Sequence, residues 1–448
     1  RSHYMPDMPD WAQDMRDLFR SGAISQFILY GNIFDLVPAP SAAVACPPLL
    51  PLKSFLEDVM FAQYDVVLHY DRGKGIRPTK GADDFGDWLQ SLPEEDKPLL
   101  QRAREPARAL EIIDRYLLRT LNLKTVARDP RFGARKVPDK IAVIIDFAQF
   151  VVPAGNALQL GGDFAANVVK TLTWANDPAI LQSNIATVLL TEQLNDLNDH
   201  VINNPHPAKL KIPLPNDQDM LEYLRCLQGP GGPFPDLEQR SEVPIDLLAR
   251  RLTGLSRVGA RTLLGQALNN HKNITNAWLT RMKKEAIERE TNGLLEFLES
   301  PFTLDNLSGS DAIKTWLRQD AQLLKKGATS SLPMGYLISG RIGTGKTFMV
   351  NCWAGELGIP CVVFKNFRDK WVGATESNLE KIFSILRALG QVVVFVDEAD
   401  QMTGKRDGGG DDSGLSGRVY AMLAKEMSDT KNRGKIIWVF ATSRPDLL

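Results

Sequence analysis

Small and basic residues between positions 340 and 347 have the composition and spacing of a phosphate-binding loop. The segment reads Gly-Arg-Ile-Gly-Thr-Gly-Lys-Thr and fits G-x-x-x-x-G-K-[ST] at every position. Its glycines let backbone N–H groups curl around a phosphate without Cβ clashes. Lys346 is expected to reach the β- and γ-phosphates of ATP, and the Thr347 hydroxyl to ligate Mg²⁺. The residues predicted to bind ATP or ADP are Gly340, Arg341, Ile342, Gly343, Thr344, Gly345, Lys346, Thr347 and Phe348.

Two acidic residues follow an apolar run further along the chain. Val392–Val396 is a candidate strand, and Asp397 and Glu398 come directly after it. In open α/β sheets, ligands bind at the carboxyl ends of the strands. Asp397 is therefore expected to hold Mg²⁺ together with Thr347. Glu398 is expected to orient and polarise the attacking water, because positioning dominates phosphoryl transfer.

The elements around these residues have an alternating strand and helix pattern. An apolar strand precedes the loop, a helix-compatible segment follows it, and this alternation favours α/β architecture with a largely parallel sheet. Helices are expected to start at Lys346 and near Ser377, and another to cover about Leu415–Met427. The predicted strands of this region are Gly335–Ser339, Cys361–Phe364, Val392–Val396 and Ile436–Phe440.

A similar α/β pattern fills the first half of the chain. The proline-rich stretch Pro38–Pro51 is expected to be a loop, Asp71–Gly75 a turn at a strand end, and Ala103–Thr120 a helix. Lys209–Leu214 is a possible short edge strand, because Pro213 cannot donate to a ladder. The other predicted strands are Phe27–Tyr30, Asp65–His69, Ile141–Ile145 and Thr187–Leu190.

The two α/β regions are joined by a helical region. Apolar residues at helical spacing predict a small helical lid from Asp217, interrupted at Gly229–Pro233, and Ala277–Leu298 reads as one connecting helix that ends before Pro301. The predicted fold class is α/β, with two P-loop-type parallel αβα sandwich modules in tandem, the first followed by the lid. The expected domains are 1–216 (first core), 217–275 (lid), 276–301 (linker helix) and 302–448 (second core).

From about Phe302 onward, the order of the motifs resembles the AAA clade of the AAA+ ATPases, the group of FtsH, NSF and katanin. Gly408–Gly417 is similar to the second pore loop of that family, and Phe440–Asp446 to its sensor 1 segment. Asp305–Gly309 lies where family members contact adenine. The residues that resemble the first pore loop are Lys370, Trp371, Val372 and Gly373.

This resemblance implies a homo-oligomeric ring, usually a hexamer, with nucleotide at the subunit boundaries and a protein substrate in the central pore. Trp371 would then grip the polypeptide; otherwise it is a half-buried core aromatic. Ser443 stands where the family usually has a catalytic sensor asparagine, and its shorter reach implies slower hydrolysis. The family's arginine fingers, its sensor 2 and its C-terminal lid would lie beyond Leu448, so the second core is expected without a lid.

The first α/β region resembles a degenerate copy of the second. Its first strand leads into Gly31-Asn32 without any Gly-Lys-Thr, and Phe147 follows Asp146 where a catalytic glutamate would stand. One reading is a degenerate AAA+ module that cannot hydrolyse ATP and serves in ring building and partner docking. The other is an unrelated α/β domain.

Composition limits the remaining function classes. The net charge is −1, from 53 basic and 54 acidic residues, which argues weakly against a nucleic-acid partner and gives no drive toward an anionic membrane. No apolar run is long enough for a membrane span. The four cysteines share no metal-ligand spacing, so a cytoplasmic location is expected. An ATP-driven remodelling motor is the first hypothesis, with a nucleotide-controlled scaffold of negligible turnover or a nucleic-acid-dependent AAA+ factor as alternatives.

Overall fold

The computed structural model describes most of the chain. The described residues are 8–40, 46–127, 137–156, 161–270, 272–298, 300–326, 328–364, 376–389, 391–397, 399 and 413–443. They form two compact units, residues 1–213 and residues 214–448. Within these ranges, no helix has both the length and the apolar character needed to cross a membrane.

The first unit is built around a six-stranded sheet with the order β5-β4-β6-β7-β1-β8. All neighbouring strands are parallel except β4 and β5, which form an antiparallel hairpin. The turn of this hairpin lies at the residues predicted as a strand-end turn, whereas β5 itself was not predicted. The strands are β1 (Gln26–Gly31), β4 (Val66–Asp71), β5 (Gly75–Lys80), β6 (Lys140–Ile145), β7 (Asn184–Thr191) and β8 (Ala208–Ile212).

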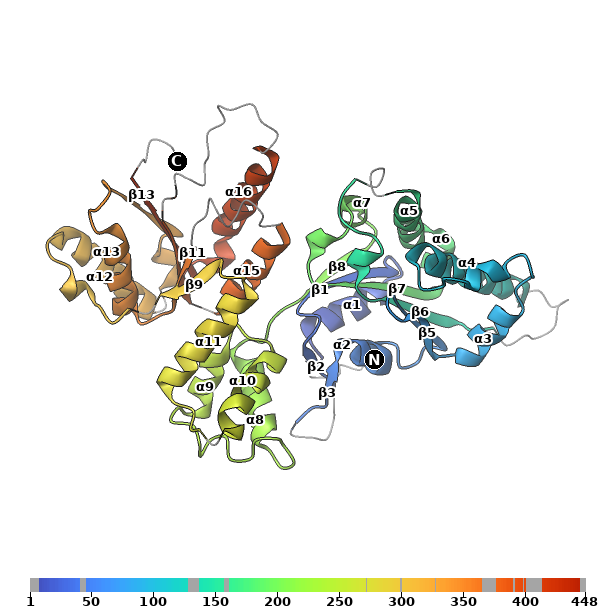
Figure 1. The fold of residues 1–448 in the computed structure, drawn as a ribbon, viewed down its shortest axis with the longest axis horizontal. Coiled ribbons are helices and arrows are strands. Elements are labelled where there is room, and N and C mark those ends of the chain that lie inside the picture. The colour runs from blue at the N-terminus through green and yellow to red at the C-terminus, as the bar shows by residue number, and fades with distance from the viewer. Residues whose placement is uncertain are drawn as a thin grey trace. The chain divides into compact units, whose positions relative to one another are not determined.

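Helices cover both faces of this sheet (Figure 1). Alternate side chains along each strand enter two separate apolar cores, as expected for strands buried on both faces. One core packs Phe27 against Trp11 of α1 and Phe55 of α2, and the other packs Ile28 with Trp174 of α5. The helices are α1 (Asp10–Arg20), α2 (Leu52–Phe55), α3 (Ala82–Gln90), α4 (Pro106–Ala127), α5 (Gly162–Asn176), α6 (Pro178–Leu181) and α7 (Asp199–Asn203).

The expectation of a loop throughout Pro38–Pro51 was wrong at both ends of the stretch. Strands β2 (Leu36–Pro38) and β3 (Leu49–Pro51) pair as an antiparallel hairpin. The prolines are compatible with it because each lies at the end of a strand in a two-stranded ribbon, where no ladder donor is required. This hairpin fills the connection between β1 and α2.

The helical region predicted from Asp217 is present, and it belongs to the second compact unit, whereas the sequence assigned it to the first module. Three of its helices start at side-chain caps: Asn216 accepts from the Asp219 N–H in a reciprocal capping box, and Ser256 and Thr275 cap α10 and α11. The helices are α8 (Asp217–Gln228), α9 (Ile245–Leu252), α10 (Arg257–Asn269) and α11 (Asn276–Glu290).

The predicted single connecting helix through Leu298 is shorter than expected. It ends at Glu290 because Asn292 and Gly293 adopt left-handed backbone angles, φ 53° and 71°, and the Gly293 N–H returns to the Glu288 carbonyl at 2.8 Å. The chain then forms β9 (Leu295–Leu298), which joins the second sheet antiparallel to β11. The residues predicted as linker thus supply part of the second α/β sheet.

The second sheet has the order β10-β13-β12-β11-β9, with all pairs parallel except the last. Figure 1 shows α12 and α13 on one side of it, with α15 and α16 on the other. The strands are β10 (Gly335–Ser339), β11 (Cys361–Phe364), β12 (Val392–Val396) and β13 (Ile436–Thr442). The helices are α12 (Asp311–Lys325), α13 (Lys346–Leu357), α15 (Glu376–Ala388) and α16 (Ser413–Ser428).

The parallel strands of the two sheets have the same topology. In each unit, the first parallel strand of the sheet pairs with the fourth, the fourth with the third, and the third with the second: β1-β7-β6-β4 in the first unit and β10-β13-β12-β11 in the second. Each of these four strands of one unit therefore has an equivalent in the other. This correspondence makes the two carboxyl edges comparable residue by residue.

Candidate functional site

The phosphate-binding loop predicted from the sequence has the backbone of an anion cradle. It connects the end of β10 to the first residue of α13, as the sequence predicted. Gly343 and Gly345 have φ of 82° and 81°, in the left-handed region that favours glycine. A Cβ atom added at either position would meet nothing within 4 Å, so the loop faces open space. Loop amides and a helix N-terminus directed at open space are suited to a phosphate.

Three polar side chains make contacts at the loop: Lys346, Thr347 and Asp397, the last directly after β12 (Val392–Val396). The Lys346 ammonium donates to the carbonyl oxygens of Gly340 and Arg341, at 2.8 and 3.0 Å. The Thr347 hydroxyl donates to Asp397 Oδ2 at 3.0 Å, across 50 positions of sequence. A hydroxyl and a carboxylate oxygen in contact are hard oxygen ligands of the kind that Mg²⁺ prefers. The residues present therefore fit a Mg²⁺ ion.

The sheet topology brings the remaining predicted residues to the same edge. Asp397 follows β12 directly and Ser443 follows β13, while β13 lies between β12 and β10. In the register, Ser339 is opposite Thr442, which places Ser443 at the edge where the loop begins. Glu398 and the predicted first pore loop, residues 370–373, lie outside the described residues, as do residues 408–412 of the predicted second pore loop.

Buried contacts fix the helix that carries the loop. The Tyr336 hydroxyl on β10 donates to Asp320 of α12 at 2.6 Å, and the Trp353 indole N–H of α13 donates to the Leu317 carbonyl at 3.2 Å. Burial, with the Asp320 carboxylate second, raises the pKa of Tyr336, so this phenol remains a donor. The rings of Tyr336 and Trp353 meet edge-on with centroids 4.9 Å apart. These contacts join α12, α13 and β10 into one rigid base for the loop.

The segment predicted to contact adenine is attached to the same helix. The Leu304 N–H donates to Glu356 of α13 at 3.2 Å, and Arg318 forms ion pairs with both Asp305 and Glu356. The ring of Phe348, the residue after the loop threonine, lies 5.4 Å from that of Phe302. The segment before the P-loop is therefore held beside the start of α13.

The equivalent edge of the first unit is closed. Gly31, at the end of β1, has φ 97°, and a Cβ there would lie 2.7 Å from the Ile212 carbonyl. The N–H groups of Gly31 and Asn32 donate to the carbonyls of Glu192 and Ile212, each at 2.9 Å. These two amides are consequently not directed at a ligand. Phe147 lies after Asp146, at the position where a catalytic glutamate would stand, and it adopts φ 50° and is 38% exposed.

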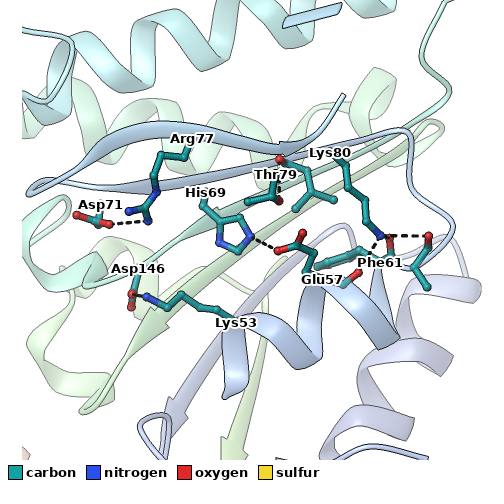
Figure 2. A network of polar contacts seen from close by, with 11 residues as sticks. Lys53, Glu57, Phe61, His69, Asp71, Arg77, Thr79, Lys80 and Asp146 are labelled. Carbon is teal, nitrogen blue, oxygen red and sulfur yellow. Dashed lines mark hydrogen bonds and ion pairs between the residues drawn. The ribbon is translucent and has the colours of Figure 1, made fainter. Parts of the chain in front are cut away.

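A network of charged side chains crosses this first edge, as Figure 2 shows. Lys53 Nζ lies 2.7 Å from Asp146 Oδ2, and Glu57 lies one helical turn later, 3.3 Å from His69 Nε2. Burial, together with the nearby charges of Arg77 and Lys53, lowers the pKa of His69 although the Glu57 carboxylate raises it, and this favours the neutral imidazole. Lys80 donates to the carbonyls of Glu57, Phe61 and Ala62 at the end of the same helix.

Lys53, Glu57 and His69 belong to no motif that the sequence reveals. Lys53 and Glu57 lie four positions apart shortly after Pro51, and this spacing places both on one helix face. Without the strand pairing, nothing indicates that this face meets Asp146 and His69. Among the described residues, no group of three or more His, Cys, Asp and Glu could hold a metal ion.

Three family models match successive parts of the chain. The N-terminal Rossmann-like domain of AAA+ chaperones matches residues 2–213, and their second helical domain matches residues 230–292. The model of the ATPase family associated with various cellular activities (AAA) matches residues 336–448. This last match contains the loop, Asp397 and Ser443.

Several curated proteins are similar in sequence to parts of this chain. The ATP-dependent zinc metalloprotease FtsH 2 of Salinibacter ruber is 31% identical over 160 residues, 34% of this chain and 23% of the relative. Peroxisomal ATPase PEX6 of Rattus norvegicus is 27% identical over 328 residues, 64% of this chain and 32% of the relative. The Cell division cycle protein 48 homolog of Archaeoglobus fulgidus is 25% identical over 246 residues, 53% of this chain and 33% of the relative. The chain thus spans a third or less of the length of each of these relatives.

Proposed function

We propose, from the premise that the chain belongs to the AAA+ ATPases, that its second unit binds and hydrolyses ATP to remodel a protein or protein complex through a ring pore. One observation carries the nucleotide part of this proposal. The open glycine loop on β10 and α13 stands beside the 3.0 Å contact between Thr347 and Asp397. That combination matches the needs of a triphosphate and its Mg²⁺ ion.

The residues of the edge then have separate roles. The loop amides and the Lys346 ammonium bind the phosphates, and Thr347 and Asp397 would hold the metal ion. Mg²⁺, when bound, neutralises charge that develops on the phosphate oxygens. Glu398, next in the chain to Asp397, orients the attacking water, and the Ser443 hydroxyl reaches toward the γ-phosphate from β13. Nucleotide chemistry is confined to this unit.

The assembly part of the proposal rests on the family. The partners are further copies of the same chain, in a ring that is a hexamer, and a protein substrate held in the pore by residues 370–373 through Trp371. The proposed domains are 1–216, 217–275 and 302–448, and residues 276–301 between the last two supply α11 and the β9 strand of the second sheet. A cytoplasmic location belongs to the same proposal, since the four cysteines are sparse in the sequence and share no metal-ligand spacing.

The experiment that tests the motor proposal is ATP turnover measured against protein concentration. If neighbouring subunits complete each site, the specific activity should rise steeply with concentration and reach a plateau once rings form. The control is the Lys346→Ala variant at every concentration, which reports contaminating ATPase. A specific activity that stays constant from the lowest to the highest concentration would contradict the ring.

The same data address the two alternatives. Tight ATP binding with negligible turnover at all concentrations would favour a nucleotide-controlled scaffold, for which Ser443 in the sensor position is the supporting feature. Stimulation by single- or double-stranded DNA or RNA would favour a nucleic-acid-dependent factor. The near-neutral charge argues against the second alternative.

Replacing Trp371 should separate turnover from work on the substrate. Trp371→Ala is expected to retain basal ATPase within about twofold and to lose unfolding of a fluorescent protein that carries an unstructured tail, because a large flat side chain is removed from the proposed grip. The matched control is Trp316→Ala, since Trp316 on α12 is a tryptophan of the same unit whose side chain is 53% exposed. If Trp371→Ala unfolds the substrate as fast as the control does, the pore-loop assignment is wrong.

A further inference from the structure

The two units place different side chains at one equivalent position. Thr347 is the second residue of α13, the helix after the first parallel strand, and it contacts Asp397, the first residue after the third parallel strand. In the first unit, Lys53 is the second residue of α2 and contacts Asp146, the first residue after β6. The Thr–Asp pair that suits a metal ion is therefore replaced by a Lys–Asp ion pair.

We propose that the Lys53 ammonium is a built-in cation that replaces the metal ion and its threonine ligand, and holds the first unit in one conformation whether or not nucleotide is present. The proposal does not depend on turnover in the second unit. It concerns how an edge without a nucleotide site keeps its helix and strands together.

The Asp146 carboxylate already has a donor on each oxygen. Oδ2 receives Lys53 Nζ at 2.7 Å, and Oδ1 receives the Phe147 N–H at 3.0 Å. Asp146 is only 5% exposed, so an ionised carboxylate there needs a compensating charge. Removing the partner of a buried charge is strongly destabilising. Because the Lys53 side chain is 45% exposed, the effect of this pair is smaller than that of a fully buried one.

Two further side chains contact the rest of the helical segment. Figure 2 shows Lys53 and Glu57 pointing from one helix face to Asp146 and His69, on two neighbouring strands. At the other end, the Lys80 ammonium caps the last carbonyls of the helical segment, which continues from α2 as a π-turn over Leu56–Met60. The side chains of Lys53, Glu57 and Lys80 thus connect residues 52–61 to the end of β6, to β4 and to β5.

Hydrogen–deuterium exchange on the full chain tests this proposal. The readout is the exchange of residues 52–61, compared with and without Mg·ATP, in a Lys346→Ala background so that the second unit does not respond. Exchange in this background should be unchanged by Mg·ATP, and Lys53→Met should accelerate it about tenfold. The matched control is Lys97→Met, because the Lys97 side chain is 47% exposed and pairs with a surface acid, Glu94.

A second variant makes the test independent of one substitution. Asp146→Asn removes the buried charge, so the double variant Lys53→Met/Asp146→Asn should exchange more slowly than Lys53→Met alone. Protection of residues 52–61 by Mg·ATP in the Lys346→Ala background would overturn the proposal. So would exchange in Lys53→Met equal to that in Lys97→Met, or purely additive effects in the double variant, since the two side chains would then not interact.

Discussion

Lys346→Ala is expected to abolish ATP binding by this chain. The Lys346 ammonium donates to two neutral carbonyl oxygens of the loop, at 2.8 and 3.0 Å. Phosphate oxygens of a bound nucleotide can take the place of these acceptors, and their negative charge makes the hydrogen bond stronger. Losing hydrogen bonds from a charged group to phosphate costs about 3 kcal/mol, or on the order of a hundredfold in affinity. Titration with a fluorescent ATP analogue in the presence of Mg²⁺ measures this loss.

The appropriate control is another lysine of the second unit. Lys425 is exposed on α16, and Lys425→Ala should bind the analogue like the unchanged chain. The fold should persist in Lys346→Ala, because the α13 interface with α12 and β10 does not use this side chain; circular dichroism checks this. Retained tight binding in a folded Lys346→Ala would refute the assignment of the site. Loss of binding would also show that the first unit contributes no strong site of its own.

The sequence predicted much of the second α/β unit because its signals are local. Gly335–Ser339, Cys361–Phe364 and Val392–Val396 are strands over the expected residues, since each is a short apolar run bounded by turn residues. Gly343 and Gly345 of the predicted loop adopt left-handed angles, which glycine allows without Cβ strain. The contact between Thr347 and Asp397 required only that two strand ends meet at one edge.

The features that the sequence did not reveal depend on distant parts of the chain. Leu295–Leu298 has good helix formers, yet it becomes a strand because β11 offers a free edge; propensity alone is a weak guide there. Lys53 follows a proline-rich stretch and carries no motif. Its role arises from the pairing of β1, β7 and β6, which brings Asp146 within 2.7 Å.

The correspondence between the two sheets gives the first unit a physical interpretation. A nucleotide site needs free backbone amides, a ligand for the metal cation and a general base. At the first edge, the N–H groups of Gly31 and Asn32 donate to backbone carbonyls, and Lys53 forms an ion pair with Asp146. Phe147 then follows Asp146, and its ring lies 5.9 Å from that of Phe34. On our proposal, the same topology therefore supports one edge suited to nucleotide and one stabilised without it.

Glu398→Gln is expected to keep ATP binding and to stop hydrolysis. The amide is nearly isosteric with the carboxylate, and Glu398 is not among the residues proposed to hold phosphate or metal, so affinity should change less than about twofold. The glutamine amide cannot accept a proton from the attacking water or polarise that water as a carboxylate does, so turnover should fall by about 10²–10⁴-fold. Single-turnover hydrolysis of radiolabelled ATP, with binding measured in parallel, separates the two effects.

Asp397→Asn provides the contrast that makes the Glu398 result specific. Asp397 accepts from Thr347 at 3.0 Å, so its neutral amide should weaken the dependence of binding on Mg²⁺ rather than chemistry alone. The two neighbouring substitutions are thus expected to have different effects. Glu398→Gln should lose turnover at an unchanged Mg²⁺ requirement, whereas Asp397→Asn should need a higher Mg²⁺ concentration for ATP binding. Undiminished turnover in Glu398→Gln would remove this residue from the mechanism. It would leave Ser443 and a group from a neighbouring subunit as the candidates for positioning the water.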